Sequence, residues 1–389
     1  MNIVNYLKYF ISPLTMILGI YMISLGSYYP ALFLLIYSLF MILGDFLMGK
    51  DDSLRSYSYP RLLNFGLYLN LPLLLIFVFM AISLLSPTVS PSTIHIFKTY
   101  FFIDLIFIKN SITILDKICL IEIVGLFIGI MGTVPGHELT HRKKNKLDMF
   151  VGNWLLAISW DCTFAIEHVY GHHKNVCLDG DPATAKRGEN VYAFIIRAII
   201  KEQKDAWRIE ISHLKRRGYS LFGIYNKMLI GYLRSILITC IAYLIGGWIG
   251  LVIYLFFALY GKHMLEAVNF IEHYGLVRVE GEPVHPRHSW NSNNVLSSIY
   301  LYNLTRHSSH HEKANLKFWE LKAYKDAPTM PYGYLSMVYL VLFLPFLYHR
   351  IMAKKVLEWD EKYATKEERK LAAIQNKNSG IKILKNYSY

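Results

Sequence analysis

Residues 118–146 read ICLIEIVGLFIGIMGTVPGHELTHRKKNK, an apolar run that ends in two histidines and a basic stretch. Apart from Glu122, the run up to Pro135 carries no charge, and its length approaches the roughly 20 residues that cross a bilayer core. His137 and His141 follow at once, and residues four apart lie on the same face of a helix. The stretch therefore predicts a membrane-spanning helix that carries a metal-binding motif to the membrane surface.

The composition of the whole chain favours an integral membrane protein. Of its 389 residues, 54% are hydrophobic and only 18% are charged, and the mean hydropathy is +0.29; soluble domains carry about 25% charged residues. A net charge of +13 suits nucleic acid or the anionic face of a membrane. The apolar runs favour the membrane, so we expect no nucleic-acid partner. The four cysteines form no CxxC pair, so we expect neither disulfides nor a thiolate metal site.

Apolar runs and the turns between them predict an all-α integral membrane protein of one domain, with about six transmembrane helices. The uncharged run from Tyr9 to Gly44 is divided by the turn sequence SYYP, and Gly246-Gly247 divides a second run, so each predicts a helical hairpin. The segment around 98–116 is ambiguous, and Tyr334 to Leu347 is short enough to favour a re-entrant or interfacial helix. The predicted parts are spans at 9–26, 29–48, 62–86, 118–136, 228–245 and 251–269, a cytoplasmic helical cap at 137–225 and 270–333, and a C-terminal tail at 349–389.

Basic residues accumulate on one side of these spans. The turns near residues 27, 88 and 246–250 carry almost no charge, and by the positive-inside rule the basic side faces the cytoplasm. We therefore expect a multi-pass protein of the cytoplasmic (inner) membrane, with both termini and all histidine clusters on the cytoplasmic side. We interpret the charges at 142–146 and 215–217 as solvated. The residues that set this orientation are Lys8, Lys50, Arg55, Arg61, Arg142 to Lys146, Lys354 and Lys355.

Nine of the fifteen histidines lie in four short clusters. The clusters are HELTH at 137–141, HVYGHH at 168–173, NFIEHYG at 269–275 and HSSHH at 307–311. On an α-helix His168 and His172 share a face, while His173 lies about 100° around the axis and can serve a second metal. One ion takes roughly four to six ligands, so nine imidazoles favour two metals, although imidazole alone does not identify them. The isolated histidines, interpreted as structural, are His95, His213, His263, His285, His288 and His349.

Two other functions remain open at this point. HELTH matches the HExxH pattern of zinc peptidases, in which Glu138 would be the general base. Such a site needs three protein ligands and a water molecule, which leaves HVYGHH and HSSHH unused. A metal transporter would favour polar residues along the spans, and these are nearly absent apart from Glu122, Arg234, His263 and Glu266.

The four clusters together resemble the membrane-bound non-haem di-iron oxygenases, and most closely the alkane 1-monooxygenase family, which is related to the fatty acid desaturase-like superfamily. The family's first box looks like HELTHR and its second like EHVYGHH. A signature similar to NFIEHYGL stands before the last box, here HSWNSNNVLSSIYLYNLTRHSSHH. The resemblance covers nearly the whole chain, and NFIEHYGL distinguishes it from the desaturases. It implies two iron ions held by His137, His141, His168, His172, His173, His273, His307, His310 and His311.

The chain departs from the family pattern in the last box. An aspartate usually stands in place of Ser309, a histidine in place of Asn303, and a glutamine in place of Thr305. None of these differences removes a matched ligand. The loss of a carboxylate can change the hydrogen bonds around the ligands, so the substrate and the reaction type stay open.

The resemblance implies hydroxylation of the terminal methyl of an alkane or similar alkyl chain that enters from the lipid. An unactivated C–H bond offers no acid, electrophile or leaving group, so a metal that activates O2 is required. Alternatives with the same site are desaturation, internal hydroxylation or oxidative decarboxylation of a fatty acyl chain. No GxGxxG after a strand, paired CxxC motif or haem motif occurs in the sequence. Two electrons must come from outside, and the resemblance implies a rubredoxin-like donor with its reductase.

Three carboxylates lie next to proposed ligands in the sequence: Glu138, Glu167 and Glu272. Adjacent residues on a helix point about 100° apart, so we expect them to accept hydrogen bonds from the histidine rings rather than to bind iron. Surface salt bridges are an equally open alternative. Glu122, within a predicted span, is either structural or part of a proton path.

Overall fold

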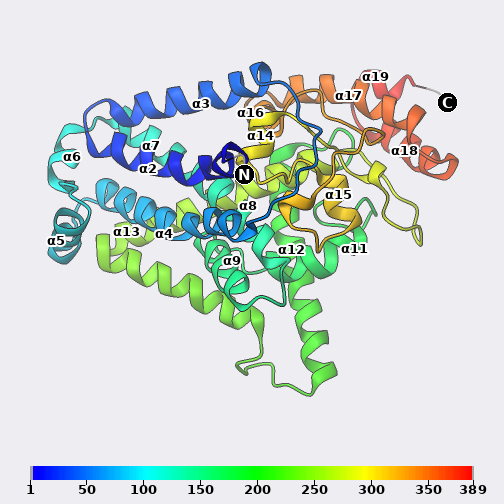
Figure 1. Cartoon of the computed structure of the whole chain (residues 1–389). Helices are drawn as coiled ribbons and strands as arrows, with labels where there is room; N and C mark the ends of the chain where they lie inside the picture. Colours follow the sequence, from blue (N-terminus) through cyan, green and yellow to red (C-terminus); the bar gives the residue numbers. More distant parts are fainter. Residues whose placement is uncertain (1–2, 388–389) are drawn as a thin grey trace. The chain divides into compact units, whose positions relative to one another are not determined.

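A computed structural model describes residues 3–387 of the chain (Figure 1). Within these residues the fold is helical, and extended pairing is limited to two isolated bridges, Lys50 to Asn294 and Asn291 to Thr329. The four cysteines are free. By the contacts within the chain, two compact units form. One comprises Met1–Phe40, Ser58–Cys162 and Asn226–Met264, and the other comprises Met41–Tyr57, Thr163–Tyr225 and Leu265–Tyr389.

The first unit is built from apolar helices. Its elements are α1 (Val4–Leu7), the 3-10 turn η1 (Lys8–Phe10), α2 (Ile11–Ser24), most of α3 (Tyr29–Leu47), α4 (Pro60–Leu85), α5 (Pro91–Tyr100), α6 (Leu105–Ser111), α7 (Ile114–Phe127), the π-helix η2 (Ile128–Thr133), α8 (Val134–Thr140), α9 (Lys146–Ile158) and most of α13 (Lys227–His273).

Five stretches are long and apolar enough to cross a membrane, namely Val4–Ser24, Tyr29–Leu47, Pro60–Leu85, Ile114–Thr140 and Lys227–His273. The last has 47 residues, or about 70 Å of helix, more than twice the thickness of a bilayer core. It is interrupted at Gly247, whose φ of 62° and ψ of −154° favour glycine. α13 is therefore the predicted helical hairpin, and its two arms bring the candidate spans to about six, as expected. α5 and α6 meet at 104°, and each alone is too short to cross.

A close helix pair presents the first histidine motif. α9 starts at the cap Asn145, whose side chain accepts the backbone N–H groups of Leu147 and Asp148. It then packs against α8 through two glycines. A Cβ atom at Gly136 would lie 3.0 Å from the Leu156 side chain, and one at Gly152 would lie 2.9 Å from Leu139 Cβ. Because the two backbones approach so closely, α8 and the histidines on it are held rigidly.

The second unit combines short helices and long connections. Its elements are the end of α3, α10 (Phe164–Glu167), the π-helix η3 (His168–His172), α11 (His173–Asn175), α12 (Val191–Arg217), the end of α13, the 3-10 turn η4 (Pro286–His288), α14 (Val295–Tyr300), α15 (His307–Glu312), the 3-10 turn η5 (Phe318–Glu320), α16 (Tyr334–Phe343), α17 (Pro345–Lys362), α18 (Lys366–Asn378) and α19 (Lys382–Lys385).

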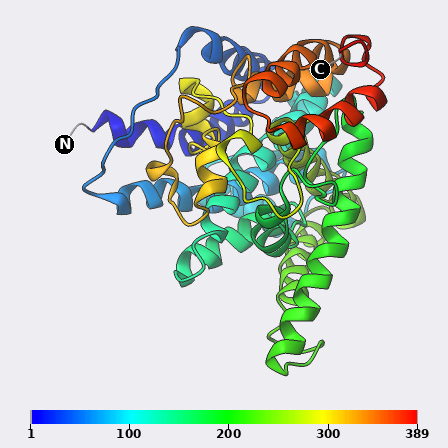
Figure 2. The same cartoon turned by 90° about the vertical axis from the view of Figure 1, so that its right-hand side faces the viewer.

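The stretch expected as a C-terminal tail is a folded part of this unit. α17, α18 and α19 pack on one another, and Figure 2 shows them in orange and red. Tyr348, Val356 and Trp359 of α17 are fully buried. This packing was not evident from the sequence, because the apolar residues of α17 are spaced around a helix between lysines and glutamates.

Candidate metal centre

The second histidine cluster forms a π-helix rather than an α-helix. In η3 each hydrogen bond reaches five residues back along the chain. His168 therefore pairs with His173, and their Nε2 atoms lie 3.2 Å apart. The His172 ring faces His273 and His311, at 4.9 Å between ring centroids in each case. The prediction that His168 and His172 share one metal is therefore wrong, because the wider turn moves His172 to another face.

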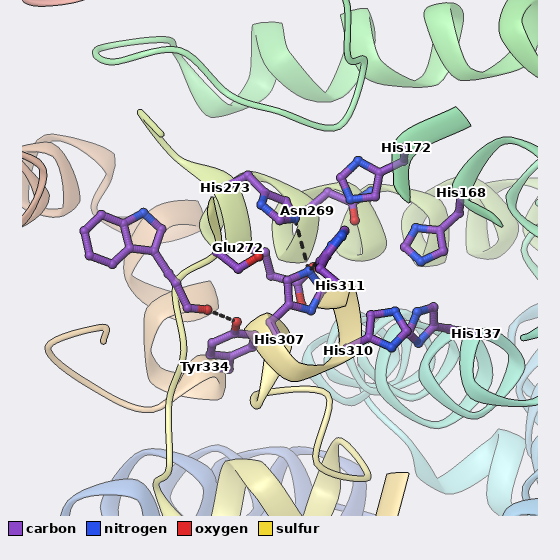
Figure 3. Close-up of polar contacts among 12 residues, drawn as sticks. His137, His168, His172, Asn269, Glu272, His273, His307, His310, His311 and Tyr334 are labelled. Atoms are coloured by element: carbon purple, nitrogen blue, oxygen red, sulfur yellow. Dashed lines mark hydrogen bonds and ion pairs between the residues drawn. The ribbon is translucent and has the colours of Figure 1, made fainter. Parts of the chain in front are cut away.

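Four buried histidines converge within the second unit: His172, His273, His307 and His311, called here the His273 group. They come from η3, the end of α13 and α15, and Figure 3 shows their rings turned towards one another. The Nε2 atom of His307 lies 3.1 Å from that of His273 and 3.0 Å from that of His311. Two nitrogens at about 2.1 Å from one ion and at a right angle lie about 3.0 Å apart. The observed separations are those of neighbouring metal ligands.

The hydrogen bonds of these rings leave lone pairs that point inward. His273 Nδ1 donates to the carbonyl oxygen of His288 at 3.0 Å, and His172 Nδ1 donates to Asp181 Oδ2 at 2.9 Å. A neutral imidazole with a proton on Nδ1 has a lone pair on Nε2. His172 Nε2 has no hydrogen-bond partner among the described residues although it is buried. Unpaired lone pairs at this depth are costly unless a cation accepts them, so the donor set fits a bound metal.

A second set, the His168 group, consists of His168, His173 and His310 in the same unit. His173 Nε2 lies 3.1 Å from His310 Nε2. Burial lowers the pKa of His310 to about 3 and holds the pKa of His311, in the His273 group, well below its ordinary value. Both rings are therefore neutral at physiological pH, which is the form that binds metals.

The first unit supplies a separate pair. His137 and His141 lie on successive turns of α8, and their Nε2 atoms are 3.2 Å apart. The expectation that HELTH presents both rings on one helix face is confirmed. Thr140 Oγ1 donates to the carbonyl oxygen of His137 at 3.1 Å, and this bond stabilises the end of the helix that carries the pair.

Comparison with known proteins shows which family the chain belongs to. The family model described as fatty acid desaturase matches residues 118–341, more than half of the chain. The chain belongs to the fatty acid desaturase family. It is therefore a multi-pass membrane protein with a histidine-rich, non-haem metal site.

The curated relatives of this desaturase-family chain are monooxygenases by name. Alkane 1-monooxygenase 1 of Pseudomonas aeruginosa is 38% identical over 65% of this chain and 66% of its own length. Alkane 1-monooxygenase 2 of Alcanivorax borkumensis is 34% identical over 66% of this chain and 68% of its own length. Xylene/toluene monooxygenase hydroxylase component XylM of Pseudomonas putida is 30% identical over 96% and 95%. The resemblance to alkane 1-monooxygenases is confirmed, over about two thirds of the length of those proteins.

The three neighbouring carboxylates have different surroundings. Glu138 accepts two hydrogen bonds from Arg142, with Nε at 3.0 Å, and Arg142 Nη1 also donates to Asn64 at 2.6 Å. The Arg142 side chain is only 7% exposed, so its interpretation as solvated charge is wrong. Glu167 lies against the backbone of Gly171, where an added Cβ would come within 2.4 Å of its Oε1 atom.

Glu272 approaches the His273 group from the inner side. Its Oε2 atom lies 3.3 Å from His307 Nε2, the nitrogen that faces the other rings, and its Oε1 atom is buried with no hydrogen-bond partner among the described residues. The expected role was that of an acceptor for a ring N–H group on the outer side. In the structure this oxygen lies instead on the side of His307 that faces the other rings.

Two residues missed from the sequence hold the outer nitrogens. Asp181 accepts from His172, and its Oδ2 atom also accepts the Thr184 hydroxyl at 2.6 Å. Burial would raise the pKa of Asp181, but the adjacent His172 ring and Thr184 lower it, so it stays a carboxylate. The carbonyl of His288 holds His273. The only local signal was the DGDP sequence at 179–182, which predicts a turn.

The departures in the last box belong to its loop framework. Ser309 Oγ accepts the backbone N–H of Lys322 at 3.0 Å, and Asn303 donates to the carbonyl oxygen of Phe318 at 2.9 Å. The Thr305 hydroxyl bonds to Ser298 at 2.8 Å.

Asn269, at the start of NFIEHYG, donates to Glu266 Oε2 at 3.1 Å. Within a span, Glu122 accepts the hydroxyl of Tyr260, so its charge has a local partner.

Proposed function

We propose that this chain is a membrane-bound di-iron monooxygenase that hydroxylates the terminal methyl of alkanes or similar alkyl chains. The observation that carries the proposal is the set of four buried imidazoles whose ring nitrogens converge in the His273 group. Its relatives named alkane 1-monooxygenase support the reaction type. Desaturation, hydroxylation or decarboxylation of a fatty acyl chain is less favoured, because these relatives are named for the monooxygenation of alkanes.

The nine histidines divide between two irons in this proposal. His172, His273, His307 and His311 would hold one, and the carboxylate of Glu272 lies beside His307 in this group. The three rings of the His168 group are one or more ligands short of a full shell for the second iron. The family resemblance adds His137 and His141, a matched pair on α8, to the nine histidines that would hold the two irons. When bound, such a pair of irons supplies O2 activation.

The proposed reaction requires two electrons, which an external electron donor supplies. The methyl C–H bond breaks and a C–O bond forms with one oxygen atom of O2, while two electrons and two protons reduce the other atom to water. The protein keeps His310 and His311 neutral by burial and orients His172 and His273 through Asp181 and the carbonyl of His288. The apolar spans admit an alkyl substrate from the lipid. The electrons come from a rubredoxin-like donor with its reductase, at the cytoplasmic side of the inner membrane.

A zinc peptidase built on HELTH is disfavoured by the state of Glu138. A general base must reach the metal-bound water with a free carboxylate. Here the Glu138 carboxylate is bound by Arg142, which also lies 3.5 Å from Asp148. The ion pair gives Glu138 a structural role at the end of α8.

A second candidate substrate is the methyl group of an aromatic hydrocarbon. XylM, a xylene/toluene monooxygenase component by name, aligns with 96% of this chain, whereas the alkane 1-monooxygenases align with about two thirds. A benzylic C–H bond is also weaker than that of a terminal methyl, so the same site can oxidise it.

The test is product analysis with the purified protein in lipid nanodiscs. We would supply rubredoxin, its reductase and NADH, and offer octane, xylene and a fatty acyl substrate in parallel under ¹⁸O2. The proposal expects two irons per chain and octanol labelled with one ¹⁸O atom, and His273→Ala should abolish the product. Labelled methylbenzyl alcohol in greater yield favours the aromatic substrate. An alkene as the product, or one zinc without iron, would contradict the proposal.

A further inference from the structure

The backbone carbonyl of His288 ties the metal centre to the C-terminal helices. This oxygen accepts His273 Nδ1–H at 3.0 Å and the thiol of Cys177 at 3.1 Å. His288 ends the 3-10 turn η4 and is fully buried. The rotation of the His273 ring, and therefore the direction of its Nε2 lone pair, depends on where η4 places this carbonyl.

The side chain of His288 fixes η4 in turn. Its Nδ1 atom accepts the backbone N–H of His285 at 3.0 Å, so the ring proton is on Nε2. That proton is donated to Glu368 Oε1 at 2.7 Å. The tautomer of His288 is thus determined by His285 and Glu368, and the ring links η4 to α18 through two hydrogen bonds.

Glu368 is a buried carboxylate in the first turn of α18. Arg287 Nε lies 3.0 Å from its Oε2 atom, and the backbone N–H of Thr365 donates to the same oxygen at 2.8 Å. Burial would raise the pKa of Glu368, but the hydrogen bonds from His288 and Thr365 and the charge of Arg287 bring it to about 2. The carboxylate is therefore charged at any physiological pH and holds Arg287 and His288 together.

α18 lies beyond residues 118–341, which the family model matches, so nothing in that match gives the helix a role. It is anchored independently of Glu368. Arg187 donates to Asp360 through two nitrogens at 2.6 Å, and also to Asn376 of α18 at 2.8 Å and to the carbonyl oxygen of Gly275 at 2.8 Å. The segment from Gly275 to His288 is therefore linked to the C-terminal helices at both ends. Gly275 is linked through Arg187, and His288 is bonded directly to Glu368.

We propose that Glu368 is a positioning residue for the metal centre: through the ring and carbonyl of His288 it sets the tautomer and orientation of His273. The inference rests on the proposed function, because it takes His273 to be an iron ligand. Groups that orient a metal-binding histidine typically change metal affinity 10- to 100-fold when they are removed. Glu368 acts one step further away, so we expect an effect of about 10-fold.

The experiment compares Glu368→Gln with Glu367→Gln. Both replace a carboxylate by an amide in the first turn of α18, but Glu367 is exposed while Glu368 is buried. Iron per chain, iron loss to a chelator and the spectrum of the iron site are measured on the purified full-length proteins. Glu368→Asp keeps the charge at a shorter reach and should restore part of the iron retention. Thermal melting in the same detergent reports general destabilisation.

Glu368→Gln should lose iron about 10-fold faster than the parent and show an altered spectrum, whereas Glu367→Gln should match the parent. If Glu368→Gln does not fold, partial iron retention and an altered spectrum in Glu368→Asp support the proposal. A parent-like spectrum in that variant contradicts it. A lower melting temperature with unchanged iron retention and spectrum would make Glu368 merely structural and leave the proposed function standing. A parent protein that binds no iron would overturn both.

Discussion

At the scale of single residues, the hydrogen bond to the outer nitrogen decides whether an imidazole can bind a metal. Asp181 holds the Nδ1 proton of His172, so Asp181→Asn should let the ring rotate and lower iron retention about 10- to 100-fold. Asp179→Asn is the matched control, since the Asp179 side chain is 87% exposed and pairs only with Lys186 in the described structure. Iron per chain after dialysis against a chelator measures the effect. Equal losses in the two variants would contradict the assigned role.

The candidate metal-binding histidines could be predicted from the sequence, but the residues that hold them in position could not. Eight of the nine histidines could be singled out because they repeat at helical spacings within short motifs, whereas His273 stands alone and followed only from the resemblance of NFIEHYGL to the family signature. Asp181, His288 and Glu368 could not, because each meets its partner through a loop or through a helix distant in the chain. The carboxylates next to the histidines in the sequence do not hold their outer nitrogens in these contacts. Glu138 forms a salt bridge with Arg142, and Glu272 faces the inner nitrogen of His307.

At the scale of elements, η3 determines which histidine rings lie together. In a π-helix His168 aligns with His173, and His172 joins the other group. The double variant His168→Ala/His173→Ala should therefore empty one site and keep about one iron per chain. The double variant His168→Ala/His172→Ala removes a ligand from each site, so both irons should be held weakly. Iron content after exposure to a chelator distinguishes these outcomes, and the reverse pattern would indicate an α-helical pairing.

The error in HVYGHH has a physical origin. Spacing alone gives the α-helical register, which is correct for HELTH and for the pairing of His307 with His311. A π-turn contains one more residue than the corresponding α-helical turn. Such turns are rare and occur frequently at functional sites. Gly171 inside η3 leaves room for the carboxylate of Glu167, four residues earlier in the chain. This side-chain contact cannot be read from the spacing of the histidines.

At the scale of the whole molecule, the apolar runs were enough to predict the spans. Long apolar stretches with few charges correspond to all five candidate helices, and Gly246-Gly247 marked the break in α13. The folded C-terminal helices were missed because α17 and α18 are rich in charge. Their burial depends on specific pairs such as Arg187 with Asp360, both of whose side chains are fully buried, rather than on an apolar run.

The orientation in the membrane follows from the same spans and can be tested by labelling. Because α5 and α6 meet at 104°, we expect neither to cross, so α7 and α8 run from the outer face to the cytoplasm. Single cysteines would replace Thr88, Lys144 and Lys354, all exposed, in a chain whose four native cysteines are replaced by serine. In intact spheroplasts a membrane-impermeant maleimide should label only Thr88→Cys, because the basic segments are retained in the cytoplasm. Lys144→Cys and Lys354→Cys should react after permeabilisation. Labelling of Lys144→Cys in intact cells would mean that α5 and α6 together form another span and that HELTH faces outward.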